Sequence, residues 1–221
     1  MNSYIRRIIN LPGTVLFNIR AFGVREGVKM PIYITNNVII RNIKRNSIII
    51  KAPLRRFMIE IGDGGSKGYP SRKGSIIIKD AAKLIFDGSA YFSKGVMLRI
   101  DEGGVMHFGN NFNANTNCSF WCSELIEIGE DTLFGFDITV RDSDGHRVSY
   151  EERKSDSKTK PIHIGKHVWC GSKSCILKGT QILDGSVIGF NSCVISAFQQ
   201  DNILIGGYPA RIIKENIMWE K

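Results

Sequence analysis

Four histidines and five cysteines are the side chains of this 221-residue sequence best suited to proton transfer, metal binding or nucleophilic attack. The histidines are His107, His146, His163 and His167. Three histidines and a water molecule can form a catalytic zinc site. His146 differs from the others because it ends the polar run RDSDGH, where Asp142 or Asp144 could orient an imidazole. An imidazole can act as a general base, but a single histidine in a polar loop is most often simply solvated.

The cysteines and the start of the chain bear on its cellular compartment. The cysteines are Cys118, Cys122, Cys170, Cys175 and Cys193, an odd number at irregular spacing, so we expect reduced thiols. The first twenty residues are interrupted by Arg6, Arg7, Pro12 and Gly13, and no apolar run approaches the roughly 18–20 residues of a membrane span. We therefore expect a cytoplasmic protein, with at most peripheral contact between its N-terminus and a membrane.

A six-residue repeat dominates the second half of the chain. Between Ile164 and Val194 the sequence reads IGKHVW, CGSKSC, ILKGTQ, ILDGSV and IGFNSC, with glycine at the second position in Gly165, Gly171 and Gly189. A helix needs a period of 3.6 and a flat sheet a period of 2, and neither fits. The repeat predicts an all-β hexapeptide-repeat solenoid, a parallel β-helix in which three hexads close one triangular coil.

In such a solenoid, residues 18 apart stack at one inter-strand spacing, roughly 4.8 Å. The first position of each hexad points inward, so Cys170 should be a core residue. A cysteine-based zinc site is therefore disfavoured. The predicted stacked pairs are Ile164 with Ile182, Cys170 with Ile188, and Cys175 with Cys193.

The repeat also divides the chain into segments. It reappears at Phe108-Gly109 and Ile128-Gly129 and loosens toward residue 75, which implies about seven coils. We expect an N-terminal segment over 1–55, a solenoid over 56–200 and a C-terminal cap helix over 201–221. The first segment should hold a helix over 3–22 and strands at 31–35 and 47–51. The polar stretch 141–161 breaks the repeat and is predicted to be a protruding loop able to carry site residues.

The formal net charge of +9 predicts attraction to anions. The basic residues run from Arg6 to Lys221 without an aromatic-interleaved basic motif, so a nucleic-acid partner is not indicated.

Three segments together make the chain resemble a known family. They are IEIGEDTLFGFDITVRDSDGH ending at His146, IHIGKHVWCGSKSCILKG around Trp169, and IGGYPARII around Arg211. Over roughly residues 75–215 the sequence resembles the hexapeptide-repeat acyltransferases, whose fold is the left-handed parallel β-helix. Within that family it is most similar to the polysaccharide and sugar O-acetyltransferases and to the maltose and galactoside acetyltransferases. The resemblance implies direct acetyl transfer from acetyl-CoA to a sugar hydroxyl in capsule, O-antigen or exopolysaccharide synthesis.

The resemblance also implies roles for individual residues. His146 matches the family's general base, with Asp142 or Asp144 orienting it, and Asn115 matches a residue that binds the acceptor or the oxyanion. The acceptor side would further include Trp169, Asn117 and Ser123, where Ser123 stands in place of a carboxylate of the galactoside-type relatives.

Coenzyme A and a neighbouring subunit complete the implied site. Backbone groups of successive coils would hold the pantetheine arm, and a basic residue would lie near the adenosine phosphate. A homotrimer is implied because the family's site is completed by a second subunit, and no metal is implied. The corresponding residues here are Gly171, Ser172, Gly189 and Ala197 for pantetheine, and Arg211 for the phosphate.

Three alternatives remain open. An N-acetyltransferase acting on an amino sugar or nucleotide-sugar would use the same histidine. A zinc carbonic anhydrase of the same fold would use three histidines, but the spacing of His163 and His167 does not match that family's ligand pair. A non-catalytic β-helix scaffold would use the positive charge to hold an acidic ligand.

Overall fold

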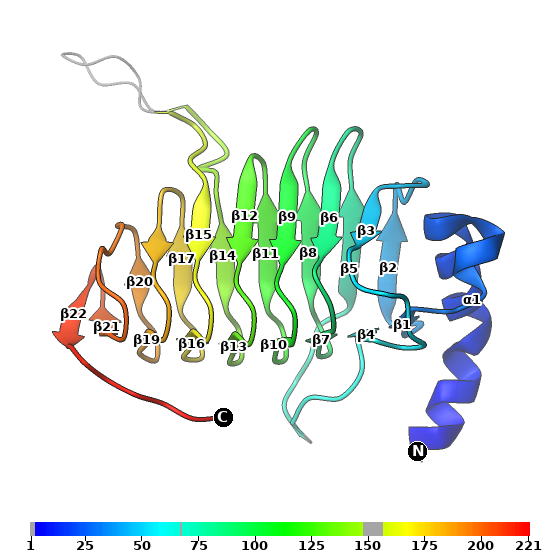
Figure 1. Ribbon diagram of the computed structural model, residues 1–221, viewed down its shortest axis with the longest axis horizontal. Coiled ribbons are helices and arrows are strands. Elements are labelled where there is room, and N and C mark those ends of the chain that lie inside the picture. Colours follow the sequence, from blue (N-terminus) through cyan, green and yellow to red (C-terminus); the bar gives the residue numbers. More distant parts are fainter. Residues whose placement is uncertain (1–2, 67, 148–156) are drawn as a thin grey trace.

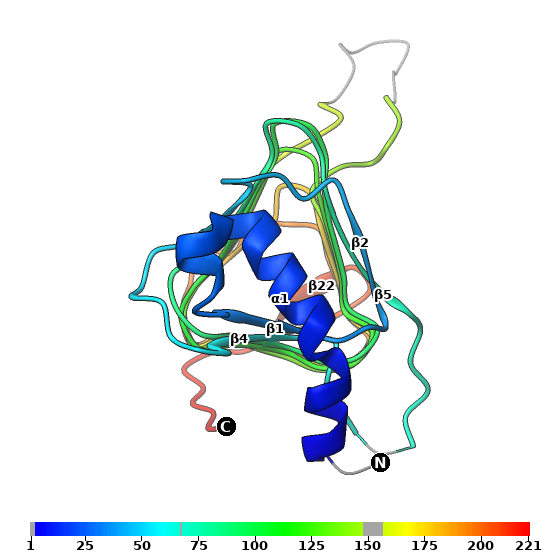
Figure 2. The same cartoon turned by 90° about the vertical axis from the view of Figure 1, so that its right-hand side faces the viewer.

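The computed structural model describes residues 3–66, 68–147 and 157–221. Most of this chain forms a three-sided stack of short parallel strands, seen from the side in Figure 1 and along its axis in Figure 2. Successive strands lie in successive sheets, and each strand hydrogen-bonds to the strand one coil further along. The predicted parallel β-helix is thereby confirmed.

The three sheets are named here in the order in which the chain visits them. The first contains β1 (Ile32–Ile34), β4 (Ile59–Ile61), β7 (Ala90–Phe92), β10 (Phe112–Ala114), β13 (Leu133–Phe134), β16 (Trp169–Cys170), β19 (Val187–Ile188), β21 (Leu204–Gly207) and β22 (Ala210–Lys214). The second contains β2 (Val38–Arg41), β5 (Gly74–Ile78), β8 (Met97–Ile100), β11 (Ser119–Cys122), β14 (Thr139–Arg141), β17 (Cys175–Leu177) and β20 (Cys193–Val194). The third contains β3 (Ile48–Ile50), β6 (Lys83–Phe86), β9 (Val105–Phe108), β12 (Leu125–Ile128), β15 (Ile162–Ile164) and β18 (Gln181–Ile182).

Three corners follow from this order. The chain turns from the first to the second sheet at the first corner, from the second to the third at the second corner, and back to the first at the third corner. The predicted register is confirmed, because the paired residues are Ile164 with Ile182, Cys170 with Ile188, and Cys175 with Cys193. The first coil, β1 to β3, lies ahead of residue 56, where the hexad pattern led us to begin the solenoid.

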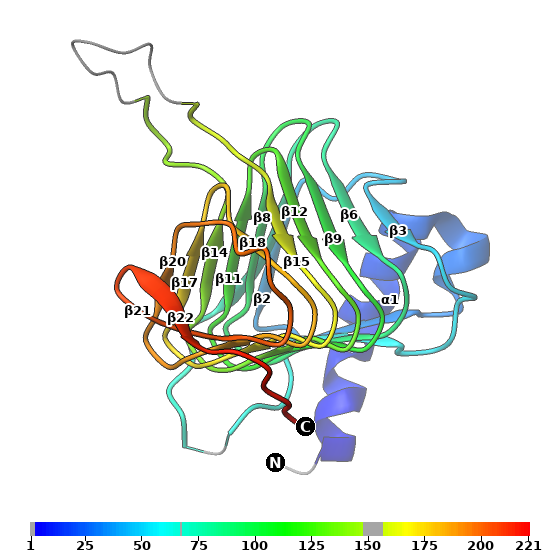
Figure 3. The same ribbon diagram turned by 60° about the vertical axis from the view of Figure 1, so that its left-hand side comes forward.

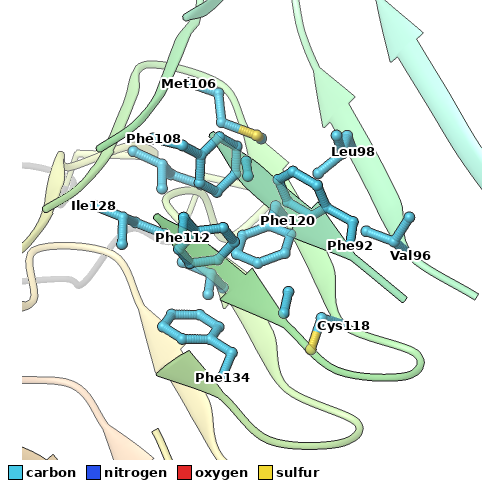
Figure 4. Close-up of a cluster of buried hydrophobic side chains, with 14 of the residues drawn as sticks. Phe92, Val96, Leu98, Met106, Phe108, Phe112, Cys118, Phe120, Ile128 and Phe134 are labelled. Atoms are coloured by element: carbon cyan, nitrogen blue, oxygen red, sulfur yellow. The ribbon is translucent and has the colours of Figure 1, made fainter. Parts of the chain in front are cut away.

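Phenylalanines fill the middle of the solenoid, where alternate residues of each strand point inward (Figure 4). The ring centroids of Phe92 and Phe108 lie 5.1 Å apart, those of Phe108 and Phe112 lie 4.7 Å apart, and Phe120 stacks on Phe134 at 5.7 Å. Fully burying a side chain of this size contributes roughly 1.5–3 kcal/mol. This aromatic core therefore stabilises the coils that carry the site residues described below.

The glycines at the second hexad position permit close approach between coils. A Cβ on Gly129 would lie 2.5 Å from the carbonyl carbon of Gly165, and a Cβ on Gly165 would lie 2.8 Å from the backbone nitrogen of Asp184. Gly165 does not have a positive φ, so conformational freedom is not the reason for glycine there. The backbone of the next coil occupies the space of a side chain.

Helix α1 (Ser3–Gly27) covers the N-terminal end of the stack (Figure 2). Phe17 is buried against the first coil, and the side chains of Thr14 and Asn18 face the open edge of β1. Thr14 Oγ1 donates to the carbonyl of Ile34 at 2.9 Å, and Asn18 Nδ2 donates to that of Ile32 at 2.6 Å. The predicted helix over 3–22 and strands near 31–35 and 47–51 are confirmed. No helix in the described residues is long and apolar enough to cross a bilayer.

The C-terminal end is closed by a strand, and the predicted cap helix is wrong. Residues Ala210–Lys214 form β22, which pairs antiparallel with β21 after a turn at Tyr208 and Pro209. Strand β21 would otherwise present an open edge, and the isoleucines of ARIIK favour a strand. The remaining tail returns along the first sheet toward the middle of the molecule (Figure 1).

Candidate active site

His146 lies on a stem that leaves the solenoid at the second corner, between β14 and β15 (Figure 3). The two sides of the stem pair through an antiparallel bridge between Ser143 and Thr159, and the N–H of Asp144 donates to the carbonyl of Lys158 at 3.1 Å. His146 is exposed at the outer end of this stem. The central part of the predicted loop, 148–156, lies outside the described residues.

Asp142 is fully buried at the base of the stem. Its carboxylate accepts the backbone N–H groups of Ser123 and Glu124 at 2.7 Å and of Leu125 at 2.9 Å. Burial raises the pKa of Asp142 above its ordinary value, although these three donors oppose the shift. The carboxylate therefore fixes the stem to the coil below and does not contact the His146 ring.

Asp144 is tied to the next coil. Its Oδ2 lies 2.6 Å from the Nζ of Lys178, which also donates to the carbonyl of Ser157 at 2.6 Å. Lys178 therefore joins both sides of the stem. Within the described residues neither Asp144 nor any other carboxylate is hydrogen-bonded to His146, so the two expected orienting residues hold the stem and not the ring.

Two arginines and a tryptophan lie next to the stem on the outer face of the second sheet. Arg99, Trp121 and Arg141 are consecutive register partners, and both guanidinium groups stack on the indole, at 4.4 and 4.5 Å from the ring centroid. An Nη atom of Arg141 lies 2.7 Å from where a Cβ on Gly145 would stand, so a larger residue there would displace the end of the guanidinium. This cluster was missed in the sequence because its members lie 20 and 22 residues apart.

Among the described residues, only one of the two arginines in this cluster forms an ion pair. Asp101 accepts from Arg99 at 3.1 Å, from Trp121 at 3.2 Å and from Lys79 at 2.7 Å. These donors outweigh its partial burial and lower the pKa of Asp101 to about 2. Arg141 forms no ion pair within the described residues, and its buried Nε has no hydrogen-bond partner. The surface beside His146 therefore carries an uncompensated positive charge.

Ser123 belongs to the same corner. Its N–H donates to Asp142, and its hydroxyl donates to Asp101 at 3.2 Å. Both groups are therefore already used in holding the turn of the coil below the stem.

Asn115 lies at the first corner, on the turn that follows β10. Its side-chain oxygen accepts the N–H of Thr116 at 3.0 Å, and within the described residues its amide nitrogen has no partner. It lines an open pocket of about 280 Å³ together with Gly65 and Ser66 of the segment that connects β4 to β5. An unpartnered NH₂ group on a residue that lines a pocket suits the expected donor role.

Asn117 holds the segment between β4 and β5 against the first corner. Its amide nitrogen donates to Asp137 at 3.0 Å and to the carbonyl of Pro70 at 3.1 Å, and its oxygen accepts the N–H of Arg72 at 3.1 Å. Tyr69 stacks on Phe136 nearby. Both amide hydrogens of Asn117 are therefore used inside the chain. The glycine-rich run GDGGSKG over 62–68 is the signal that could have revealed that this segment lies against the first corner.

Trp169 points outward from the first sheet, with 42% of its surface exposed. Its ring lies 6.0 Å from that of Trp219 in the C-terminal tail. Trp219 itself stacks on His167 at 4.1 Å and donates from its indole to the carbonyl of His167 at 2.9 Å. The tail thus forms one wall beside Trp169, which sequence reasoning did not predict.

The residues expected to hold coenzyme A are distributed over several faces. The N–H groups of Gly171 and Gly189 donate to the carbonyls of Ile188 and Ile205 at 2.8 and 2.7 Å, within the ladder between coils. These two glycines can offer a ligand close approach but no amide hydrogen. Ser172 Oγ accepts the N–H of Phe136 at 2.9 Å.

Ala197 lies on a different face from those glycines, whereas Arg211 pairs with Gly206, the neighbour of Gly189. Ala197 is exposed and bridges Gln181 on the third sheet. Arg211 is exposed on β22 at the C-terminal end, where it donates to the carbonyl of Ala210 at 2.9 Å. One chain therefore does not gather all the expected coenzyme A residues.

One chain also does not bring His146 and Asn115 together. Asn115 lies between the first and second sheets, whereas His146 lies between the second and third. A full side of the triangle separates the two corners (Figure 2). A site that contains both residues needs two copies of the chain.

The other histidines are engaged in side-chain contacts on or near the third sheet. His107 Nε2 lies 2.8 Å from Asp87, and Nδ1 of His107 and of His163 each lie 3.2 Å from an oxygen of Glu127. Within the described ranges no group of three His, Cys, Asp or Glu side chains could hold a metal ion. A zinc site with histidines from neighbouring subunits, as in the carbonic anhydrase alternative, is not tested by a single chain.

Comparison with known proteins gives the family. No family model matches the chain. The putative lipopolysaccharide biosynthesis O-acetyl transferase WbbJ of Escherichia coli K12 is 32% identical over 145 residues, which cover 59% of this chain and 74% of that protein. The chain belongs to the hexapeptide-repeat acyltransferase family, and it is an acetyltransferase.

One further relative matches a smaller part of the chain, and one solved structure matches it with lower identity. The galactoside O-acetyltransferase of E. coli K12 is 37% identical over 114 residues, which cover 51% of this chain and 55% of that enzyme. A solved structure of a galactoside acetyltransferase in complex with coenzyme A has 20% identity and a TM-score of 0.39, and covers 98% of this chain and 84% of its own.

Proposed function

We propose that this acetyltransferase uses acetyl-CoA to acetylate a hydroxyl group of a sugar in a surface-polysaccharide precursor. The observation that carries the proposal is the placement of His146 on a stem fixed by Asp142, beside the half-buried arginine and tryptophan cluster. The similarity to an enzyme named for lipopolysaccharide biosynthesis and to a galactoside O-acetyltransferase supports a sugar acceptor.

The chemistry is direct transfer. His146 takes the proton from the acceptor hydroxyl as its oxygen attacks the thioester carbonyl. The carbonyl oxygen becomes an oxyanion, and the free amide nitrogen of Asn115 from a neighbouring chain can donate to it. The C–S bond then breaks, and the proton passes from His146 to the departing thiolate. All five cysteines are free, and none is needed for an acyl-enzyme intermediate.

The charge of Arg141 indicates which acceptors the site would favour. Its guanidinium lies at the base of the stem with a buried, unpartnered Nε, and the nearby Asp101 is already shared among Lys79, Arg99 and Trp121. A carboxylate or phosphate group pairs well with a guanidinium that has no ion-pair partner. We therefore include in the proposal an acceptor that carries an anionic group near the acetylated hydroxyl.

The assembly and the donor site belong to the same proposal. It includes a left-handed sense of coiling for the β-helix of each chain and a location in the cytoplasm. Three such chains would form a homotrimer, and this assembly would bring Asn115 of one chain toward His146 of the next. Coenzyme A would then lie across the exposed surfaces near Trp169, Gly171 and Gly189, with Arg211 available for a phosphate.

Calorimetry on metal-free protein tests the donor first. We expect coenzyme A to bind at about one molecule per chain with a Kd on the order of micromolar, and more weakly when salt is raised or the 3′-phosphate is removed. Absence of binding, together with stoichiometric zinc in untreated protein, would overturn the acetyl-CoA proposal in favour of a lyase of the same fold.

A further inference from the structure

Helix α1 directs a row of polar residues inward, beside the buried Phe17 and Ala21, and several aliphatic residues outward. Asn10, Thr14 and Asn18 lie four residues apart and are buried at the edge of the first coil, where Asn10 Oδ1 accepts the N–H of Asn36 at 2.8 Å. This arrangement differs from a usual surface helix, whose inner face is mainly an apolar stripe. The difference arises because the end of a β-stack presents backbone N–H and C=O groups that need polar partners.

The outer face of α1 is consequently rich in exposed aliphatic side chains. Leu16 is 69% exposed, Ile8 is 56% exposed, and Ile5 and Ile9 are close to half exposed. Their spacing of three, four and seven residues places them on one face of the helix. Val24, after the kink at Gly23, adds a further side chain with 67% exposure. Within the described residues nothing covers this stripe.

Positive charge gathers at the same end of the molecule. Residues 1–56 contain eleven Lys and Arg residues and a single acidic residue, Glu26, whereas the remaining 165 residues contain 19 basic and 20 acidic residues. The whole net charge therefore belongs to α1 and the first coil, which the even spread of basic residues along the sequence had hidden. Several of these side chains form no ion pair with any described residue: Arg20, Arg41, Arg45, Arg55 and Arg56.

We propose that the outer face of α1, together with the basic side chains of the first coil, docks on the surface of an anionic lipid bilayer. An interfacial helix inserts aliphatic side chains at the boundary between headgroups and acyl chains while its arginines contact the phosphates. A second copy of the same face would bring two strongly positive surfaces together. A nucleic acid would use the arginines but leave Ile8 and Leu16 in water.

This docking gives the molecule an orientation. Helix α1 runs across the end of the solenoid, so a helix lying flat on the bilayer directs the coils away from it (Figure 2). The stem with His146 lies several coils from that end (Figure 1). The proposal therefore concerns a surface separate from the active site and does not depend on the identity of the acceptor.

Co-sedimentation of the full chain with lipid vesicles tests the proposal. We expect the chain to bind vesicles that contain about one third phosphatidylglycerol, and at least tenfold more weakly to pure phosphatidylcholine vesicles or in high salt. The double variant Ile8→Ser with Leu16→Ser should lose at least tenfold in affinity because it removes two inserted side chains. Arg41→Gln with Arg45→Gln should lose about tenfold or more by removing two charges.

A matched control lies at the opposite end. Phe190→Ser with Ile213→Ser removes two side chains that are 66% and 64% exposed, in a region without excess positive charge, and should leave vesicle binding unchanged. Circular dichroism and thermal unfolding confirm that each variant is folded. No binding to anionic vesicles, or equal losses in the helix variant and the control, would overturn the proposal. A fall in molecular mass by light scattering for Ile8→Ser with Leu16→Ser, without vesicle binding by the parent chain, would assign the face to self-association instead.

Discussion

The carboxylate of Asp142 accepts the backbone N–H of Glu124 at 2.7 Å and so joins the stem of His146 to the coil beneath it. This contact separates two roles that look alike in the sequence. Asp142 and Asp144 both precede the histidine, but one is buried among backbone donors and the other is an exposed partner of Lys178.

Asp142 is expected to matter for stability. Replacing it with Ala leaves the N–H groups of Ser123, Glu124 and Leu125 without an acceptor, which should cost roughly 2–4 kcal/mol. The control Asp144→Ala breaks a pair whose carboxylate is 43% exposed and should cost less than about 1 kcal/mol. Urea unfolding of the two variants measures the difference, and equal losses would contradict the assignment.

His146→Ala should lower turnover by at least about 10²-fold. The affinity for coenzyme A should change little, because the imidazole acts on the acceptor hydroxyl. Steady-state rates and calorimetry on the same preparation check both statements. Near-normal turnover would show that another group removes the proton.

Separate single variants should complement each other if the site is shared between chains. His146→Ala and Asn115→Ala place their defects at different corners. In trimers assembled at random from equal amounts of the two, about a quarter of the sites contain both native residues, so activity should recover to about a quarter of the parent level. Mixtures no more active than the single variants would place both residues in a site formed by one chain or would remove Asn115 from it.

Arg141→Gln should raise the KM for an acidic acceptor by at least about tenfold while changing kcat less. The substitution keeps a polar side chain of similar length but removes the charge that lies unpaired beside Gly145. Lys158→Gln, on the opposite side of the stem, is a suitable control with the same change in charge. Equal effects of the two variants on KM would indicate a general effect of net charge and not a specific contact.

Asp101 should make stability depend on acid pH. Its pKa is lowered to about 2, so the ionised form is favoured in the folded chain. The resulting stabilisation is complete above the ordinary value near 3.8 and is lost as the pH falls through about 2. Because the side chain is 24% exposed, we expect roughly 1–2 kcal/mol after allowance for solvent screening. Urea unfolding between pH 5 and 2 should show a larger loss of stability in the parent chain than in Asp101→Asn, and parallel curves would contradict it.

The hexads were sufficient to predict register, because an inward aliphatic residue every six positions leaves one way to stack. Ile164 pairs with Ile182 as the period requires. The first coil lacks glycines at the second hexad position and has longer turns, so its strand β2 was not predicted, and neither was β4 at the start of the second coil. The sequence ARIIK was assigned to a helix because the neighbouring edge strand, which selects the strand conformation of β22, cannot be seen locally.

The candidate site was only partly predictable for a related reason. His146 stands in a recognisable segment, but Arg99, Trp121 and Arg141 meet through the strand register, and the first-corner segment that contains Tyr69 meets Asn117 over 48 residues of chain. Thr14 and Asn18 point inward and bond to the backbone of β1, whereas the N-terminal amphipathic pattern alone would place polar residues in solvent.

The two ends of the stack also determine whether the molecule has a finite length. Each coil offers the next a row of backbone donors and acceptors, and only Thr14 and Asn18 at one end and β22 at the other stop that row. A chain lacking α1 and the last hairpin would present complementary open edges at its two ends. Copies of it could pair head to tail through these edges. The caps at the two ends therefore prevent the chain from assembling into a fibre.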